Sequence, residues 1–126
     1  MIDLAKRQGE GPTSLKLIAN ENNLSENYLE QLASPLRNAG LIKSIRGAYG
    51  GYVLAKNAKD ITAGDVIRVL EGPITLVEGI ENEKPAQQNL WKKISEAIKN
   101  VLDSTTLEDL ANHIDDEPQD SYMFYI

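Results

Sequence analysis

The sequence contains no cysteine, and this absence removes several kinds of chemistry at once. Without a thiol, the chain forms no disulfide, has no thiolate nucleophile, and holds no zinc-thiolate site or cysteine-ligated iron–sulfur cluster. A chain that lacks cysteine fits a reducing cytoplasm. We therefore expect no cofactor and no metal site.

Long hydrophobic runs are also absent. No apolar run approaches the roughly 20 residues that a membrane-spanning helix needs, and residues 1–11 lack a signal-peptide pattern. We expect a cytoplasmic protein with no membrane partner.

Histidine is nearly absent, because His113 is the only one. Its spacing provides no partners for a metal or a catalytic site, and Asp115 and Asp116 lie in a polar stretch where solvation is the ordinary state. There is no P-loop, nucleophile elbow or GxGxxG motif. We expect no catalytic residue, and an enzyme is the weakest of the functional hypotheses.

Charge is unevenly distributed along the chain, whose net charge is −6. Residues 1–60 carry eight basic and six acidic residues, or +2, and residues 61–126 carry five and thirteen, or −8. Between positions 31 and 59 there is no acid, and the basic residues there are Arg37, Lys43, Arg46, Lys56 and Lys59. This pattern fits either a nucleic-acid contact or a solvated charged surface, and charge alone leaves both open.

The stretch from residue 24 to residue 54 carries the clearest structural pattern. Ser25 is a strong N-cap candidate for a helix that ends at Gly40, and this helix has an apolar face and a polar face. Two short apolar strands follow, IKSI and YVL, joined by the glycine-rich tip RGAYGG. This order predicts a mainly α fold with a small β-hairpin, the winged helix-turn-helix.

Such a fold presents hydrogen-bonding side chains to double-stranded DNA. The candidate groups on the helix that begins at Ser25 are Ser25, Asn27, Tyr28, Glu30 and Gln31. On the hairpin, Arg46 is placed to enter a minor groove beside Tyr49, and Arg37 and Lys43 are placed to neutralise phosphates.

A long amphipathic helix is predicted from Pro85 to about Leu102. Its apolar stripe consists of Leu90, Trp91, Ile94, Ile98 and Val101. The stripe must be covered either by the chain's own domain or by a second copy. Thr62 with Asp65 predicts a capping box before this helix, and Thr105 with Glu108 predicts another after it. We divide the chain into a winged helix-turn-helix region (1–72), a connector (73–84), a dimerisation helix with a short following helix (85–114) and an acidic, aromatic tail (115–126).

Three motifs, LSENYLEQL, PLRNAGLIKSIRGAYGGYVLA and ITAGDVIRVLEGP, resemble the bacterial winged-helix regulator family of IscR, NsrR and CymR. The segments GPTSLK, EGPI, DSTTLEDLA and YMFYI are similar to the cysteine-metabolism repressors of that family. The resemblance implies a homodimer that binds a palindromic operator, with Ser25, Tyr28 and Glu30 at DNA-contact positions and Arg46 as the wing arginine. It also implies that the long helix pairs across the two-fold axis.

The sequence departs from the family pattern in two places. Cluster-binding members have cysteines in the connector before the long helix, and none occurs here. Gln88 stands where IscR has a histidine, so the resemblance does not extend to an iron–sulfur sensor. Family members usually begin with further residues, basic ones included, so we expect the front of the first helix to be missing before Met1.

The resemblance further implies that the signal arrives through a protein, the cysteine synthase O-acetylserine sulfhydrylase. The Ile126 carboxylate on an acidic tether suits capture in a pocket for an amino-acid carboxylate, with Tyr122, Phe124 and Tyr125 beside it. Alternatively, this aromatic tail packs on its own dimer, and the two states can coexist. Our leading hypothesis is a repressor of cysteine and sulfur metabolism; the alternative is a winged-helix protein-interaction module that has lost DNA binding through its shortened first helix.

Overall fold

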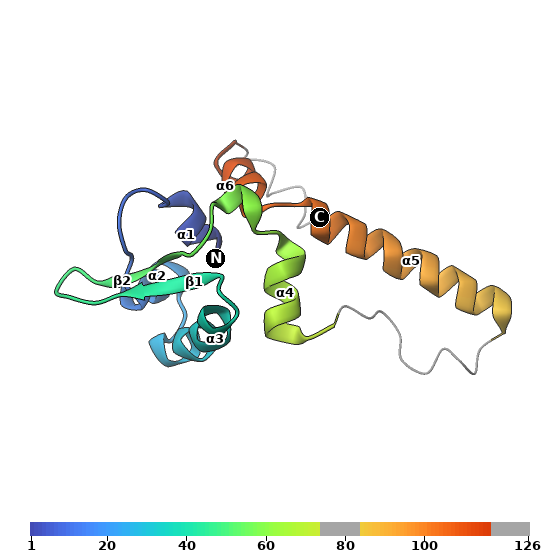
Figure 1. The fold of residues 1–126 in the computed structure, drawn as a ribbon, viewed down its shortest axis with the longest axis horizontal. Helices are drawn as coiled ribbons and strands as arrows, with labels where there is room; N and C mark the ends of the chain where they lie inside the picture. The colour runs from blue at the N-terminus through green and yellow to red at the C-terminus, as the bar shows by residue number, and fades with distance from the viewer. Residues whose placement is uncertain (74–83, 117–126) are drawn as a thin grey trace.

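The computed structural model describes residues 1–73 and 84–116. Within them, the fold consists of helices and one two-stranded antiparallel hairpin whose tip projects away from the helices (Figure 1), which confirms the predicted mainly α, winged-helix fold. The elements in chain order are α1 (Ile2–Lys6), α2 (Leu15–Asn22), α3 (Glu26–Asn38), β1 (Ile42–Ile45), β2 (Gly51–Leu54), the 3-10 helix η1 (Ala58–Asp60), α4 (Ala63–Glu71), α5 (Pro85–Ser104) and α6 (Leu107–Asp116).

The helices begin where the sequence predicts caps. The backbone N–H of Tyr28 donates to Ser25 Oγ at 3.0 Å, which satisfies one of the free amides at the start of α3. At the start of α4, Thr62 and Asp65 exchange two hydrogen bonds of 3.0 Å each, from backbone N–H to side-chain oxygen in both directions. Both predicted caps are therefore confirmed.

The cap of α6 differs from the prediction by one residue. Thr105 and Glu108 were expected to form the capping box, but Thr106 and Asp109 form it, with both hydrogen bonds at 3.0 Å. The Thr105 hydroxyl instead donates to the carbonyl of Val101 at 2.7 Å. The sequence contains the capping-box spacing twice, one residue apart. The first threonine, Thr105, bonds to the end of α5, so the second one caps α6.

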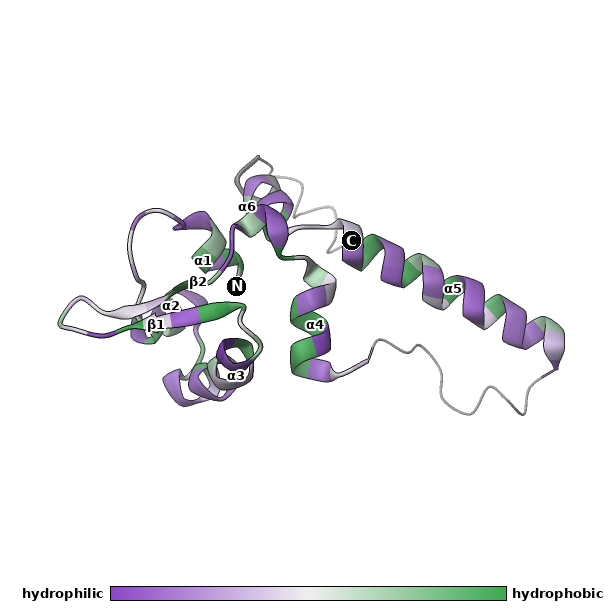
Figure 2. Ribbon diagram, viewed as in Figure 1, coloured by the Kyte–Doolittle hydropathy of each residue, from purple (hydrophilic) through white to green (hydrophobic). Residues whose placement is uncertain are grey.

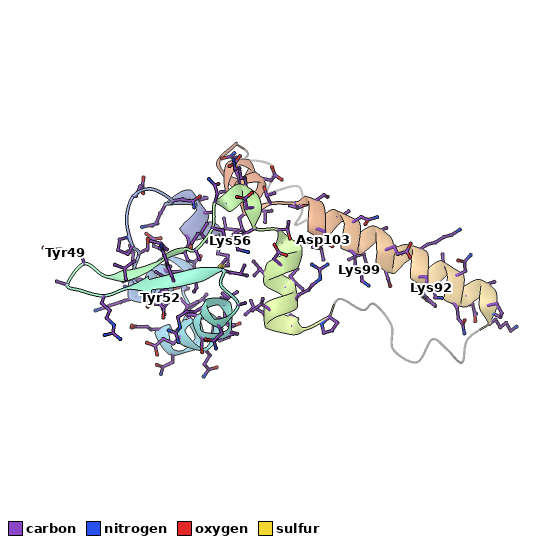
Figure 3. The ribbon with its side chains drawn as sticks, in the orientation of Figure 1. Tyr49, Tyr52, Lys56, Lys92, Lys99 and Asp103 are labelled. Carbon is purple, nitrogen blue, oxygen red and sulfur yellow. The ribbon has the colours of Figure 1, made fainter. Side chains whose placement is uncertain are left out.

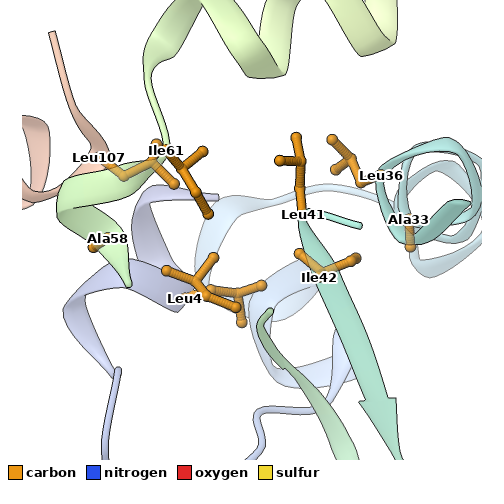
Figure 4. Packing of buried hydrophobic residues seen from close by; sticks show 9 residues of the cluster. Leu4, Ala33, Leu36, Leu41, Ile42, Ala58, Ile61 and Leu107 are labelled. Atoms are coloured by element: carbon orange, nitrogen blue, oxygen red, sulfur yellow. The ribbon is translucent and has the colours of Figure 1, made fainter. Parts of the chain in front are cut away.

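One hydrophobic core joins the two ends of the described chain (Figure 4). Ile61, just before α4, is 0% exposed, and Leu107, at the start of α6, is 2% exposed. They pack in one cluster with Leu4 of α1, Leu36 of α3 and Ile42 of β1. We call the part of the chain that shares this core the winged-helix unit; it includes α1, the hairpin and also α6, which the sequence division grouped with the long helix.

Helix α5 extends away from this core (Figure 1). None of its residues is buried, and hydrophobic and hydrophilic residues alternate along its length (Figure 2). Among the helices in residues 1–73 and 84–116, none is both long and apolar enough to cross a lipid bilayer.

Candidate nucleic-acid interface

A tight turn sets α3 against α2. Asn23 adopts a left-handed conformation, with φ of 56° and ψ of 41°, between the two helices. Asparagine tolerates this region better than most residues. The backbone N–H of Leu24 donates to the carbonyl of Ala19 at 3.0 Å and fixes the exit from α2. This helix-turn-helix places α3 at the surface.

Helix α3 separates its apolar and polar residues as predicted. Leu36 is buried and Leu29 and Leu32 are partly buried, whereas Tyr28 is 50% exposed. The other predicted contact residues on this helix face solvent, namely Ser25, Asn27, Glu30 and Gln31. Since the cap bond uses one lone pair of Ser25 Oγ, its O–H remains able to donate. In the single chain this polar face is therefore exposed.

The hairpin presents Arg46 and Tyr49 at its tip. Its strands pair from Ile42 with Leu54 to Ile45 with Gly51. Tyr49 is 92% exposed and points away from the molecule at the far end of the hairpin (Figure 3). A cation and an aromatic ring at a projecting tip form the wing that the sequence predicts.

A backbone bridge joins β2 of the wing to the segment before α2, and no sequence motif indicates this bridge. The N–H of Thr13 donates to the Tyr52 carbonyl at 3.0 Å, and the N–H of Tyr52 donates to the Thr13 carbonyl at 2.8 Å. A Cβ on Gly51 would lie 2.7 Å from the Ser14 nitrogen and even closer to the Thr13 carbonyl. Thr13 is 5% exposed and forms an isolated antiparallel bridge with Tyr52 of β2. This close approach explains the glycine.

Arg37 connects α3 to the wing, and Lys43 lies on the wing itself. Arg37 Nη1 donates to the hydroxyl of Tyr52 on β2 at 3.3 Å, although the arginine remains exposed. Lys43 is exposed on β1 and pairs with Val53 across the hairpin. Both cations are therefore exposed on or beside the hairpin.

The remaining predicted residues fall into two groups. On α5, Trp91 and Ile94 are partly buried, whereas Leu90, Ile98 and Val101 are 54%, 36% and 63% exposed. The predicted tail residues lie outside the described residues; they are Tyr122, Phe124, Tyr125 and Ile126. His113 lies in α6, and its side chain is also outside the described part.

The whole described chain resembles known regulators. Residues 1–113 match Rrf2, described as an iron-dependent transcriptional regulator. The chain belongs to the Rrf2 family. CymR of Bacillus subtilis strain 168 is 70% identical over 126 residues, which are 100% of this chain and 91% of CymR.

Solved structures of Rrf2 relatives share the fold. The structure of CymR, described as the global cysteine regulator of B. subtilis, has a TM-score of 0.84 at 70% identity and covers 89% of this chain and 87% of that one. The structure of T. potens IscR has a TM-score of 0.78 at 46% identity, with 98% and 87% covered. This Rrf2 protein is thus a transcriptional regulator and not an enzyme, as the sequence predicts.

The iron in the family description does not fit this chain as a cysteine-held cluster. The sequence has no thiolate to hold one. In the part of the chain that the structure describes, no group of three or more His, Asp or Glu side chains could hold a metal ion. We assign no step of its action to iron.

Proposed function

We propose that this Rrf2 protein is a cytoplasmic, homodimeric repressor of cysteine- and sulfur-metabolism genes that binds a palindromic operator in double-stranded DNA. The observation that carries the proposal is the exposed polar face of α3 beside an exposed, cationic wing. The high identity to CymR supports the choice of target genes.

In this proposal, α3 enters the major groove and the wing reaches the adjacent minor groove. Asn27 and Gln31 carry amides that suit adenine, and Glu30 can accept a hydrogen bond from a cytosine amino group. Because a carboxylate repels phosphate, Glu30 contributes selectivity rather than affinity. Arg46 in a narrow minor groove meets a concentrated negative potential.

The exposed stripe on α5 supports the proposed dimerisation. Leu90 and Val101 are more than half exposed in the single chain, and apolar faces of this kind mark interaction sites. Pairing two copies of α5 about a two-fold axis covers the stripe and gives two identical DNA-reading surfaces. Two-fold symmetry in the protein requires two-fold symmetry in the operator.

The proposed signal is cysteine synthase acting as corepressor. An enzyme pocket that binds an amino-acid carboxylate offers donors that suit the carboxylate of Ile126. The tail residues Tyr122 and Phe124 would add apolar contact beside it.

The test uses an operator that the wild-type chain selects from random double-stranded DNA. Replacing Arg46 with alanine is expected to weaken DNA binding about tenfold. It should also lower the slope of log affinity against log salt concentration by about one, because a cation that contacts a phosphate or the minor groove is lost. Lys92→Ala, which removes an exposed cation on α5, is the matched control and should leave both unchanged. Unchanged binding in Arg46→Ala, or failure of the wild type to select DNA, would instead favour the protein-interaction module.

A further inference from the structure

Helix α5 is attached to the winged-helix unit at one end. The N–H of Ala63 donates to the Thr105 carbonyl and the N–H of Leu107 donates to the Ile61 carbonyl, both at 2.8 Å. These two backbone bonds hold the segment that follows α5 against the start of α4. The two bonds fix the position of the C-terminal end of α5. They do not fix the direction of the helix, and no residue of α5 is buried in the core to do so.

A side-chain ion pair connects α4 directly to α5. Arg68 Nη1 lies 2.7 Å from Asp103 Oδ1, and Arg68 Nη2 donates to Asp103 Oδ2 at 2.7 Å. Two parallel bonds between a planar guanidinium and a planar carboxylate constrain orientation as well as distance. The hydrogen bond from Arg68 lowers the pKa of Asp103, so this carboxylate is charged at neutral pH.

Gly64 provides the space for this pair. It is buried in the first turn of α4, and a Cβ at this position would collide with Asp103 Oδ1 and lie 3.1 Å from Arg68 Nη1. Its φ is not in the left-handed region, so the backbone does not require glycine there. The carboxylate of Asp103 packs over Gly64, and this contact explains why the position has no side chain.

We propose that Arg68 and Asp103, seated on Gly64, are positioning residues that set the angle between α5 and the winged-helix unit, and thereby the spacing of the two DNA-reading surfaces. This inference rests on the proposed dimer through α5. The 20 residues of α5 form a lever about 30 Å long, so a swing of about 10° moves its far end by about 5 Å. That exceeds the rise of one base pair, about 3.4 Å.

The test measures the distance between two spin labels in the dimer without DNA. Because the chain has no cysteine, Lys16→Cys, at an exposed position on α2, gives one label per protomer. The labelled parent should give one narrow distance distribution. Asp103→Asn and Gly64→Ala should broaden it or shift it by several ångströms, and the charge exchange of Arg68→Asp with Asp103→Arg should restore it.

Glu21→Gln is the matched control. It breaks another ion pair with a 2.7 Å contact, between Arg7 and Glu21, whose side chains are similarly exposed (32% and 43%, against 38% and 46% for Arg68 and Asp103). This control lies within the winged-helix unit and should leave the distance unchanged. A narrow, unshifted distribution in Asp103→Asn and Gly64→Ala would overturn the inference while the dimer stands. If the labelled parent gives no measurable distance between two spin labels, both the dimer and the inference are overturned.

A second measurement tests the spacing of the two DNA-reading surfaces by DNA binding of the unlabelled protein. The wild type should prefer its selected operator over one with a base pair inserted between the half-sites. In Asp103→Asn this preference should fall by about fivefold, in line with an exposed but well-aligned ion pair, and the charge exchange should restore it. An unchanged preference in Asp103→Asn would also overturn the inference.

Discussion

The hydroxyl of Ser25 caps α3, and in the proposed function it also donates to a phosphate. Ser25→Ala should lower the free energy of unfolding by about 1 kcal/mol through loss of the cap and should also weaken operator binding. Ser25→Asp retains an acceptor for the Tyr28 N–H but brings a negative charge to the DNA. It should therefore restore stability and not DNA affinity.

Chemical denaturation and fluorescence anisotropy on labelled operator separate these effects. Ser44→Ala removes an exposed hydroxyl on β1 and serves as the control for both measurements. If Ser25→Ala were as stable as the wild type, the cap would contribute nothing. If Ser25→Asp bound DNA as well as the wild type, the hydroxyl would not contact phosphate.

Gly51 and Gly47 lie in the same wing but differ in what surrounds them. Nothing lies within 4 Å of a Cβ built on Gly47, whose φ is +126°, whereas one on Gly51 would collide with the Thr13 backbone. Gly47→Ala should cost about 1 kcal/mol of backbone strain, and Gly51→Ala should cost about 2–3 kcal/mol because a backbone cannot move aside cheaply. Thermal unfolding of the two variants checks the order, and equal losses would contradict it.

At the scale of elements, the sequence predicts best what local chemistry decides. Gly40 was expected to end α3, and it does so with φ of +80°. The N–H of Leu41 donates to the Leu36 carbonyl and that of Gly40 to the Arg37 carbonyl, both at 3.0 Å. All these groups lie within one turn of the chain, so their pattern is readable without the fold.

Contacts between distant elements were not predictable in this way. Nothing near Thr13 indicates that Tyr52 will pair with it, and Arg68 and Asp103 are 35 residues apart. In the candidate interface, the exposed face of α3 followed from helical periodicity. The bond from Arg37 to Tyr52 did not, because it depends on how closely α3 and the hairpin pack.

A charge placed in the apolar stripe of α5 should weaken the proposed dimer. Val101→Glu should raise the dimer dissociation constant at least tenfold, or about 1.4 kcal/mol, because pairing would bury an unpartnered charge. Asn100→Glu adds the same charge at the neighbouring exposed position, outside the stripe. Sedimentation equilibrium compares the two, and a similar effect of both would argue against the stripe as the interface.

At the scale of the whole molecule, the two halves of the chain differ in charge. Residues 1–60 sum to +2 and residues 61–126 to −8. DNA therefore attracts the first half and repels the second, which favours an orientation with α3 and the wing toward the duplex.

A deletion in the tail distinguishes binding of the enzyme from dimerisation. Deleting Ile126 moves the terminal carboxylate and removes its side chain, so binding to cysteine synthase should be lost in calorimetry, because a pocket for an amino-acid carboxylate requires both. Gln119→Ala, earlier in the same tail, should bind the enzyme normally. The dimer mass and the operator affinity without the enzyme should not change. Unchanged enzyme binding after the deletion would contradict the capture of the tail, and a weakened dimer would show instead that the aromatic tail packs on its own protein.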